Sequence, residues 1–178
     1  NMRKNLEIIL VADGKSRKSE KIFRFLTKRD KRVVKYITIE HGGAPKARNE
    51  GFKYVTGDYV SFWDSDCFAE IGMLRMWAKY FIMKPECGFV YTGHRLIFDK
   101  VNEPFGLPLD SEKFDPWLLT CYNYIPTMFP MKKEIFPGFD ESLKSLQDWD
   151  LWLTITEKGH KGEYFEGYGW SSDATRKG

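Results

Sequence analysis

Three carboxylates stand where predicted strands end. Asp13 follows the apolar run at residues 6–12, and Asp64 and Asp66 follow a second run at residues 59–63. Ligands of open parallel sheets bind beyond the carboxyl ends of the strands. If the two strands are parallel, these acids share one edge. Carboxylates beside apolar residues are costly to bury without compensation, and a hard divalent cation with oxygen ligands would provide it.

Each of these acidic motifs also has a simpler interpretation. Asp64-Ser65-Asp66 is equally typical of a solvated turn, and Asp13-Gly14 is a common turn signal. Asp148 lies at the start of a predicted late helix, where acids favour the helix dipole and Trp149 would pack in the core. A carboxylate beside an acceptor hydroxyl is, however, also what general-base catalysis requires.

Strands and helices alternate around these residues, which predicts an α/β fold with a mostly parallel sheet flanked by helices. The expected strands are residues 6–12, 33–39, 59–63 and 88–92, and the expected helices are residues 15–29, a segment around Pro45, 68–84 and 147–158. In the third helix the apolar residues Ile71, Leu74, Ala78 and Phe81 recur at helical spacing. Residues 94–125 lack periodicity and are predicted to be irregular. The polar tail at residues 171–178 is predicted to be mobile, and residues 170–176 could form a flap.

Length and composition narrow the class of protein. The 178 residues fit one domain with its own core. A net charge of +3, from 28 basic and 25 acidic residues, argues against a nucleic-acid binder. A small excess of Lys and Arg in residues 1–53 is either a solvated surface or attraction to anionic lipid or a phosphate-bearing substrate.

The cysteines and the hydropathy bear on the compartment. Cys67, Cys87 and Cys121 are odd in number and have no C-x-x-C spacing, so neither a disulfide framework nor a zinc site is expected. No apolar run approaches the roughly 20 residues of a membrane span, and no signal peptide is visible. We expect a cytoplasmic protein with reduced thiols, with peripheral membrane association as a further possibility.

Four segments, taken in order, resemble those of family 2 glycosyltransferases with the GT-A fold. They are ILVADGK at residues 9–15, ARNEGFKYVTGDYVSFWDSD at 47–66, PGFDESL at 137–143 and QDWDLWL at 147–153. Residue by residue, the resemblance implies that Asp13, Arg48 and Asp64 contact the nucleotide. It implies that Asp66, with Asp64 nearby, binds Mn²⁺ or Mg²⁺ on the diphosphate.

On the acceptor side, the resemblance implies that Asp148 is the catalytic base, with Gly138, Phe139, Asp140 and Trp149 shaping the acceptor site. The implied activity is metal-dependent, inverting transfer from a nucleoside-diphosphate sugar, expected to be a UDP-sugar, to a hydroxyl of a glycan, lipid-linked or polysaccharide acceptor. Polysaccharide biosynthesis is the implied setting. Residues 1–93 would form the nucleotide-sugar half and residues 94–170 the acceptor half.

The sequence also departs from the family pattern. Family members carry a strand and helix before the Asp-Gly strand, whereas only Asn1–Asn5 precede Leu6 here. Cys67 replaces a common Asp, and Gln147 replaces the usual Glu. An inactive module that binds a glycan or partner protein is therefore the main alternative. A nucleotidyltransferase ranks lower, because it would need a Gly-rich phosphate loop after its first strand.

Overall fold

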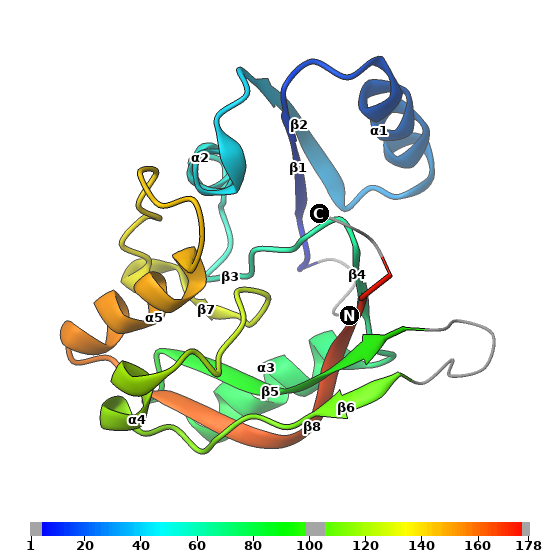
Figure 1. The fold of residues 1–178 in the computed structure, drawn as a ribbon. Coiled ribbons are helices and arrows are strands. Elements are labelled where there is room, and N and C mark those ends of the chain that lie inside the picture. Colours follow the sequence, from blue (N-terminus) through cyan, green and yellow to red (C-terminus); the bar gives the residue numbers. More distant parts are fainter. Residues whose placement is uncertain (1–4, 99–105, 176–178) are drawn as a thin grey trace.

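The computed structural model describes residues 5–98 and 106–175, and they form an α/β fold (Figure 1). In chain order the elements are β1 (Ile8–Asp13), α1 (Arg17–Arg29), β2 (Val33–Ile39), α2 (Gly43–Phe52), β3 (Tyr59–Val60), β4 (Cys67–Ala69), α3 (Met73–Met83), β5 (Phe89–Ile97), β6 (Leu107–Leu109), α4 (Pro116–Cys121), β7 (Met131–Lys132), the 3-10 helix η2 (Lys133–Ile135), α5 (Gln147–Glu157) and β8 (Gly162–Asp173). The alternation expected from the sequence is confirmed in its first half.

The strands form two sheets in the described residues. β1 and β2 pair in parallel, and a second sheet has the order β3-β7-β5-β8-β4, with β6 paired to β5. Its longest ladder, between β5 and β8, is parallel, whereas the short ladders of β3, β4, β6 and β7 are antiparallel. The prediction of parallel pairing thus holds for the two long ladders, while the antiparallel strands are short additions.

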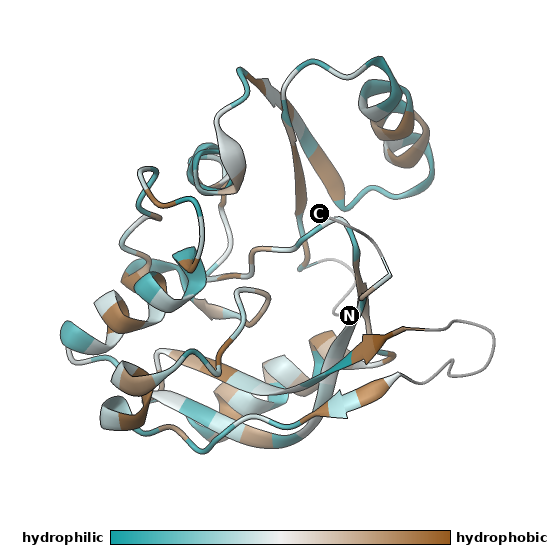
Figure 2. Ribbon diagram, viewed as in Figure 1, coloured by the Kyte–Doolittle hydropathy of each residue, from teal (hydrophilic) through white to brown (hydrophobic). Residues whose placement is uncertain are grey.

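The small sheet is held by one helix on each strand. On α2, a Cβ at Gly51 would come within 2.9 Å of Val11 Cγ2, so this glycine lets the helix backbone approach β1 closely. On α1, the ring of Phe23 stacks on Tyr36 of β2 at 4.8 Å between centroids. Figure 2 shows β1 as a largely apolar strand, although every one of its apolar residues is only partly buried.

The main core lies around the larger sheet. α3 packs behind β5 and β8, and α5 lies at the other side near α4 (Figure 1). The largest fully buried side chains are Trp152, Tyr91, Phe89, Phe129, Leu119 and Ile125. They come from β5, α4, α5 and the segment before β7, so residues 94–170 contribute as much core as the first half.

Two predicted elements are shorter than expected. The strand predicted at residues 59–63 is regular only at Tyr59–Val60, although Phe62 is buried. The helix predicted from residue 68 begins at Met73, because Phe68 pairs with Ser171 in β4. The face that α3 buries is Met73, Trp77 and Phe81, so Leu74 and the fully exposed Ile71, which precedes the helix, point to solvent instead.

Other differences concern the second half of the chain. The segment predicted to be irregular contains the end of β5, β6 and α4. The predicted mobile tail and flap begin inside β8, because residues 170–173 are the end of that strand and lie beside β4. Residues 176–178 of the predicted tail lie outside the described ranges. No helix in the described part of the chain is long and apolar enough to cross a membrane.

Candidate nucleotide-sugar site

Arg48 connects three segments that are far apart in the sequence. From α2, its Nη2 donates to Asp64 Oδ1 at 2.7 Å and its Nη1 donates to Gln147 Oε1 at 3.4 Å. Its guanidinium also lies over the ring of Phe139, 5.2 Å from the centroid. The side chain is only 13% exposed. The predicted nucleotide residues Arg48 and Asp64 are therefore together, next to the start of α5.

The acidic triplet lies in the turn between β3 and β4. Cys67 N donates to Asp64 O at 3.2 Å and closes that turn. The carboxylate of Asp64 is 41% exposed, and Asp66 is partly buried. The prediction that a buried strand leads into buried acids is therefore only partly right, since the carboxylates reach the surface and can meet a ligand.

Cys67 is the residue that replaces a common Asp of the family. Burial and the charges of Asp66 and Asp64 raise the pKa of its thiol to about 12, so the sulfur is protonated near neutral pH. Its Sγ lies 3.8 Å from Asp66 Oδ1, where it is a weak donor. The triplet therefore offers oxygen ligands without a thiolate.

The implied divalent ion would need ligands beyond the side chains of the acidic triplet. Within residues 5–98 and 106–175, no three His, Cys, Asp or Glu side chains gather closely enough to hold a metal ion by themselves. Mg²⁺, however, commonly binds through one or two carboxylates together with substrate phosphates. Asp66 and Asp64 are two residues apart in the sequence and offer carboxylate oxygens. They fit a divalent ion that is bound in this way.

Asp13 ends β1 and accepts hydrogen bonds from the N-terminus of α2. Gly42 N and Gly43 N donate to its two oxygens at 2.8 and 3.0 Å, and His41 Nδ1 lies 2.8 Å from Oδ2. Burial alone would raise the pKa of this carboxyl, but the two amides and His41 outweigh it and lower the pKa. Asp13 is thus joined to the helix that carries Arg48 rather than paired through a shared sheet with Asp64.

Asn49 joins α2 to the predicted acceptor loop. This residue was not among the site residues predicted from the sequence. Its Nδ2 donates to Phe139 O and to Glu141 Oε1, both at 2.9 Å, and its Oδ1 accepts from Phe139 N at 2.8 Å. Its position between Arg48 and the glycine of the ARNEG segment was the available signal. Gly138, with φ +94°, provides the left-handed turn that brings the loop to Asn49.

The remaining predicted acceptor residues differ in their surroundings. Asp140 is exposed and accepts from Ser142 N at 2.8 Å, so it caps its own turn. Asp148 is partly buried in the first turn of α5, and Leu146, with φ 60°, precedes that helix in a left-handed conformation. Trp149 donates from Nε1 to Leu119 O at 2.6 Å, which fastens α5 to α4.

The sequence of the chain matches the model of a known protein family. The model of glycosyl transferase family 2 matches residues 1–138. The chain belongs to glycosyl transferase family 2. An uncharacterised glycosyltransferase of Rickettsia conorii is 28% identical over 171 residues, covering 89% of this chain. The chain spans 26% of the length of that relative.

Two solved structures have the same fold as this family 2 chain. S. aureus TarS in complex with UDP-GlcNAc superposes with a TM-score of 0.72 at 18% identity, covering 99% of this chain and 51% of that one. Mannosyltransferase PcManGT of Pyrobaculum calidifontis, in complex with GDP-Man and Mn²⁺, gives 0.70 at 15% identity, covering 99% and 50%. The fold is therefore the GT-A fold.

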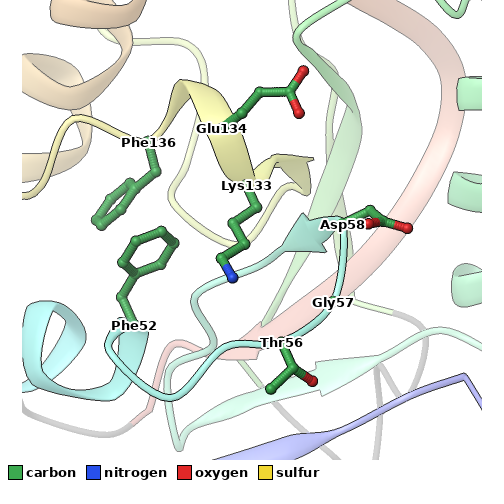
Figure 3. A pocket seen from close by; sticks show the side chains of 7 residues that line it. All are labelled: Phe52, Thr56, Gly57, Asp58, Lys133, Glu134 and Phe136. Atoms are coloured by element: carbon green, nitrogen blue, oxygen red, sulfur yellow. The ribbon is translucent and has the colours of Figure 1, made fainter.

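A hollow in this family 2 chain lies away from the acidic triplet. It is lined by Phe52, Thr56, Gly57, Asp58, Lys133, Glu134 and Phe136. Figure 3 shows Lys133 directed toward the segment that joins α2 to β3, where its Nζ donates to Val55 O at 2.5 Å. Asp58 precedes β3 and Asp64 follows it, so the hollow is at the opposite end of that strand and contains none of the predicted site residues.

Proposed function

We propose that this chain transfers a sugar from a nucleoside-diphosphate sugar to a hydroxyl group of an acceptor. The observation that carries the proposal is the position of Arg48, which contacts Asp64 of the acidic triplet and Gln147, the neighbour of Asp148. A donor bound at the triplet and an acceptor bound at Asp148 would then be adjacent. Such positioning of two reactants can lower a barrier by about 7–11 kcal/mol.

On the donor side, Asp13 would accept hydrogen bonds from the nucleobase, and Arg48 and Asp64 would orient the nucleotide. Asp66 and Asp64 would hold Mn²⁺ or Mg²⁺ against the diphosphate. When bound, such an ion stabilises the negative charge that develops on the leaving nucleoside diphosphate. We favour a UDP-sugar as donor, since S. aureus TarS was solved with UDP-GlcNAc. PcManGT was solved with GDP-Man, which makes a GDP-sugar the second choice.

On the acceptor side, Asp148 would accept the proton of the attacking hydroxyl. The hydroxyl oxygen would form a bond to the anomeric carbon as the bond to the diphosphate oxygen breaks, and attack opposite the leaving group would invert the configuration. Gly138, Phe139, Asp140 and Trp149 would shape the space for the acceptor. Residues 1–93 would thus serve mainly the donor and residues 94–170 the acceptor. We propose a glycan, lipid-linked or polysaccharide acceptor, handled at the cytoplasmic side.

The test separates donor binding from transfer. Radiolabelled UDP-GlcNAc and GDP-Man are each supplied with Mn²⁺ and a panel of polysaccharide and membrane-lipid acceptors. Incorporation is compared between wild type, Asp148→Asn and the control Glu157→Gln, which alters an exposed acid at the other end of α5. We expect Asp148→Asn to lose about 10²–10⁴-fold in transfer while donor binding is retained and the control stays active.

Two results would refute parts of this proposal. Undiminished transfer by Asp148→Asn would place the base elsewhere. If no nucleotide sugar bound while a polysaccharide did, the chain would be an inactive binding module instead.

A further inference from the structure

The outward face of α3 is unusually apolar for a helix on the surface. Leu74, Ala78 and Ile82 form one row along it at i, i+4 spacing, and Ile71 projects from the turn before the helix. Ile71 is fully exposed, Ile82 is 79% exposed and Leu74 is 40% exposed. Exposed apolar side chains gathered on one face of a surface helix indicate a surface that contacts a partner protein or a membrane.

A second row beside this one carries positive charge. Arg75 and Lys79 are exposed, and Met83 continues the row with a further exposed apolar side chain. α3 itself contains no acid, since Glu70 precedes it and Glu86 follows it. Among the described residues, neither Arg75 nor Lys79 has a salt-bridge partner.

We propose that the outward face of α3 is a docking surface for an anionic lipid bilayer. Helices that lie in the bilayer interface combine an apolar face with Lys and Arg, and each cation near an anionic surface contributes favourably. Ile71, Leu74 and Ile82 would enter the acyl boundary, while Arg75 and Lys79 would meet the headgroup phosphates. The excess of basic residues noticed in residues 1–53 lies outside this face, so the surface is a separate one.

The shape of the surface favours lipid over a protein groove. The apolar side chains project from a convex helix, and the hollow described above is bordered by α2, η2 and their flanking loops rather than by α3. A protein partner would need a groove of its own that fits these protruding side chains. A fluid lipid surface accepts them without such a groove. No membrane-spanning segment is required, since the helix would lie in the plane of the interface.

The charges also argue against pairing with a second copy of this chain. In an antiparallel pair of α3 helices related by a two-fold axis, the same flank of each helix meets its equivalent. Arg75 and Lys79 would then face the same two cations of the other copy. Anionic lipid neutralises these charges, and a symmetric dimer concentrates them.

Binding of this surface to a membrane would bring the protein close to lipid-linked acceptors. It does not require that the protein binds a nucleotide-sugar donor. A membrane-bound glycosyltransferase would meet lipid-linked acceptors by diffusion in two dimensions. Vesicle binding can be measured without any nucleotide, so failure of the proposed transfer activity and failure of this inference are distinguishable.

The test is co-sedimentation with vesicles of phosphatidylcholine alone, or of phosphatidylcholine and phosphatidylglycerol in equal parts. The wild type is compared with Ile71→Ser/Ile82→Ser, with Arg75→Gln/Lys79→Gln and with the control Trp117→Ser, which removes an apolar side chain that is 72% exposed on α4. Melting temperatures check that each variant folds. Because Ile71 and Ile82 are exposed, we expect their substitution by serine to leave the fold intact.

We expect binding to the anionic vesicles and little to phosphatidylcholine alone. The Ile71→Ser/Ile82→Ser variant should lose about tenfold or more in affinity, and Arg75→Gln/Lys79→Gln should lose affinity and salt dependence together. The control should bind as the wild type does. Unchanged binding by the double serine variant would overturn the proposal, as would absence of wild-type binding. A wild-type dimer in sedimentation analysis that the double serine variant dissolves would instead assign the surface to a second copy.

Discussion

At the scale of single residues, Asp13 couples the stability of the fold to pH. Its folded-state pKa is lowered, because the amides of Gly42 and Gly43 and the ring of His41 outweigh the effect of burial. The ionised carboxylate therefore stabilises the fold above its unfolded-state pKa, and this stabilisation is lost as the pH falls through the folded-state pKa. The relevant window lies below about pH 4.

We predict that Asp13→Asn lowers the melting temperature near neutral pH and flattens its decline in acid. Asparagine cannot carry the charge that the two glycine amides favour. The measurement is the melting temperature of wild type and variant from neutral pH to about pH 3. Two parallel curves would mean that Asp13 makes no pH-dependent contribution.

Arg48 differs from the surface arginines in its burial and in its two partners. Lysine at this position keeps the charge but cannot contact Asp64 and Gln147 together. We predict that Arg48→Lys lowers the free energy of unfolding by about 1–3 kcal/mol and weakens donor binding. The control Arg24→Lys alters an exposed pair with Glu20 at the same 2.7 Å distance, and it should cost under about 1 kcal/mol.

Urea unfolding of both variants gives the comparison. Equal losses in Arg48→Lys and Arg24→Lys would show that the buried position of Arg48 confers no added stability.

The sequence could group Arg48 and Asp64 in one candidate site because both lie in one recognisable motif, and the two side chains are in contact. It could not predict the contacts of Asn49 with Phe139 and Glu141, since they join residues about 90 positions apart.

At the scale of elements, the approach of α2 to β1 depends on one glycine. A Cβ at Gly51 would lie 2.9 Å from Val11 Cγ2. A Cβ at Gly57 would lie 3.6 Å from its nearest neighbouring atom, Tyr59 O. We predict that Gly51→Ala destabilises the protein by about 1–3 kcal/mol, whereas Gly57→Ala has little effect. Because α2 carries Arg48 and Asn49, donor binding should weaken with Gly51→Ala as well.

Denaturant unfolding monitored by circular dichroism tests this prediction. If Gly51→Ala were as stable as Gly57→Ala, β1 and α2 would have room to separate without cost, and the close packing of this pair would not matter for the site.

Local patterns predicted some elements well and others poorly. α1, β2 and α5 were found within two residues of their expected bounds, because capping, periodicity and β-branched runs are local signals. β8 was missed, since Gly162–Asp173 contains several glycines and serines, which are weak strand signals, and it is a strand through its pairing with β5 and β4. The helix predicted from residue 68 began too early because Phe68 finds a strand partner in Ser171.

At the scale of the whole molecule, the predicted α/β class and the family are confirmed, and the arrangement of the sheets is the new information. β1 and β2 form a sheet of their own, so Asp13 reaches the acidic triplet through α2 instead of through neighbouring strands. The sequence could not show this, because sheet order depends on long-range pairing. The roles of Asp13, Arg48, Asp64, Asp66 and Asp148 in catalysis stay predictions.

The central claim is that the acidic triplet binds a nucleotide sugar with a divalent ion. Isothermal titration with UDP-GlcNAc and with GDP-Man, each in the presence of Mn²⁺, tests it most directly. We predict saturable binding of one donor, weakened about tenfold or more by Asp66→Ala and unchanged by Glu157→Gln. Equal donor affinity in wild type and Asp66→Ala, or binding that is indifferent to removal of Mn²⁺, would contradict the claim.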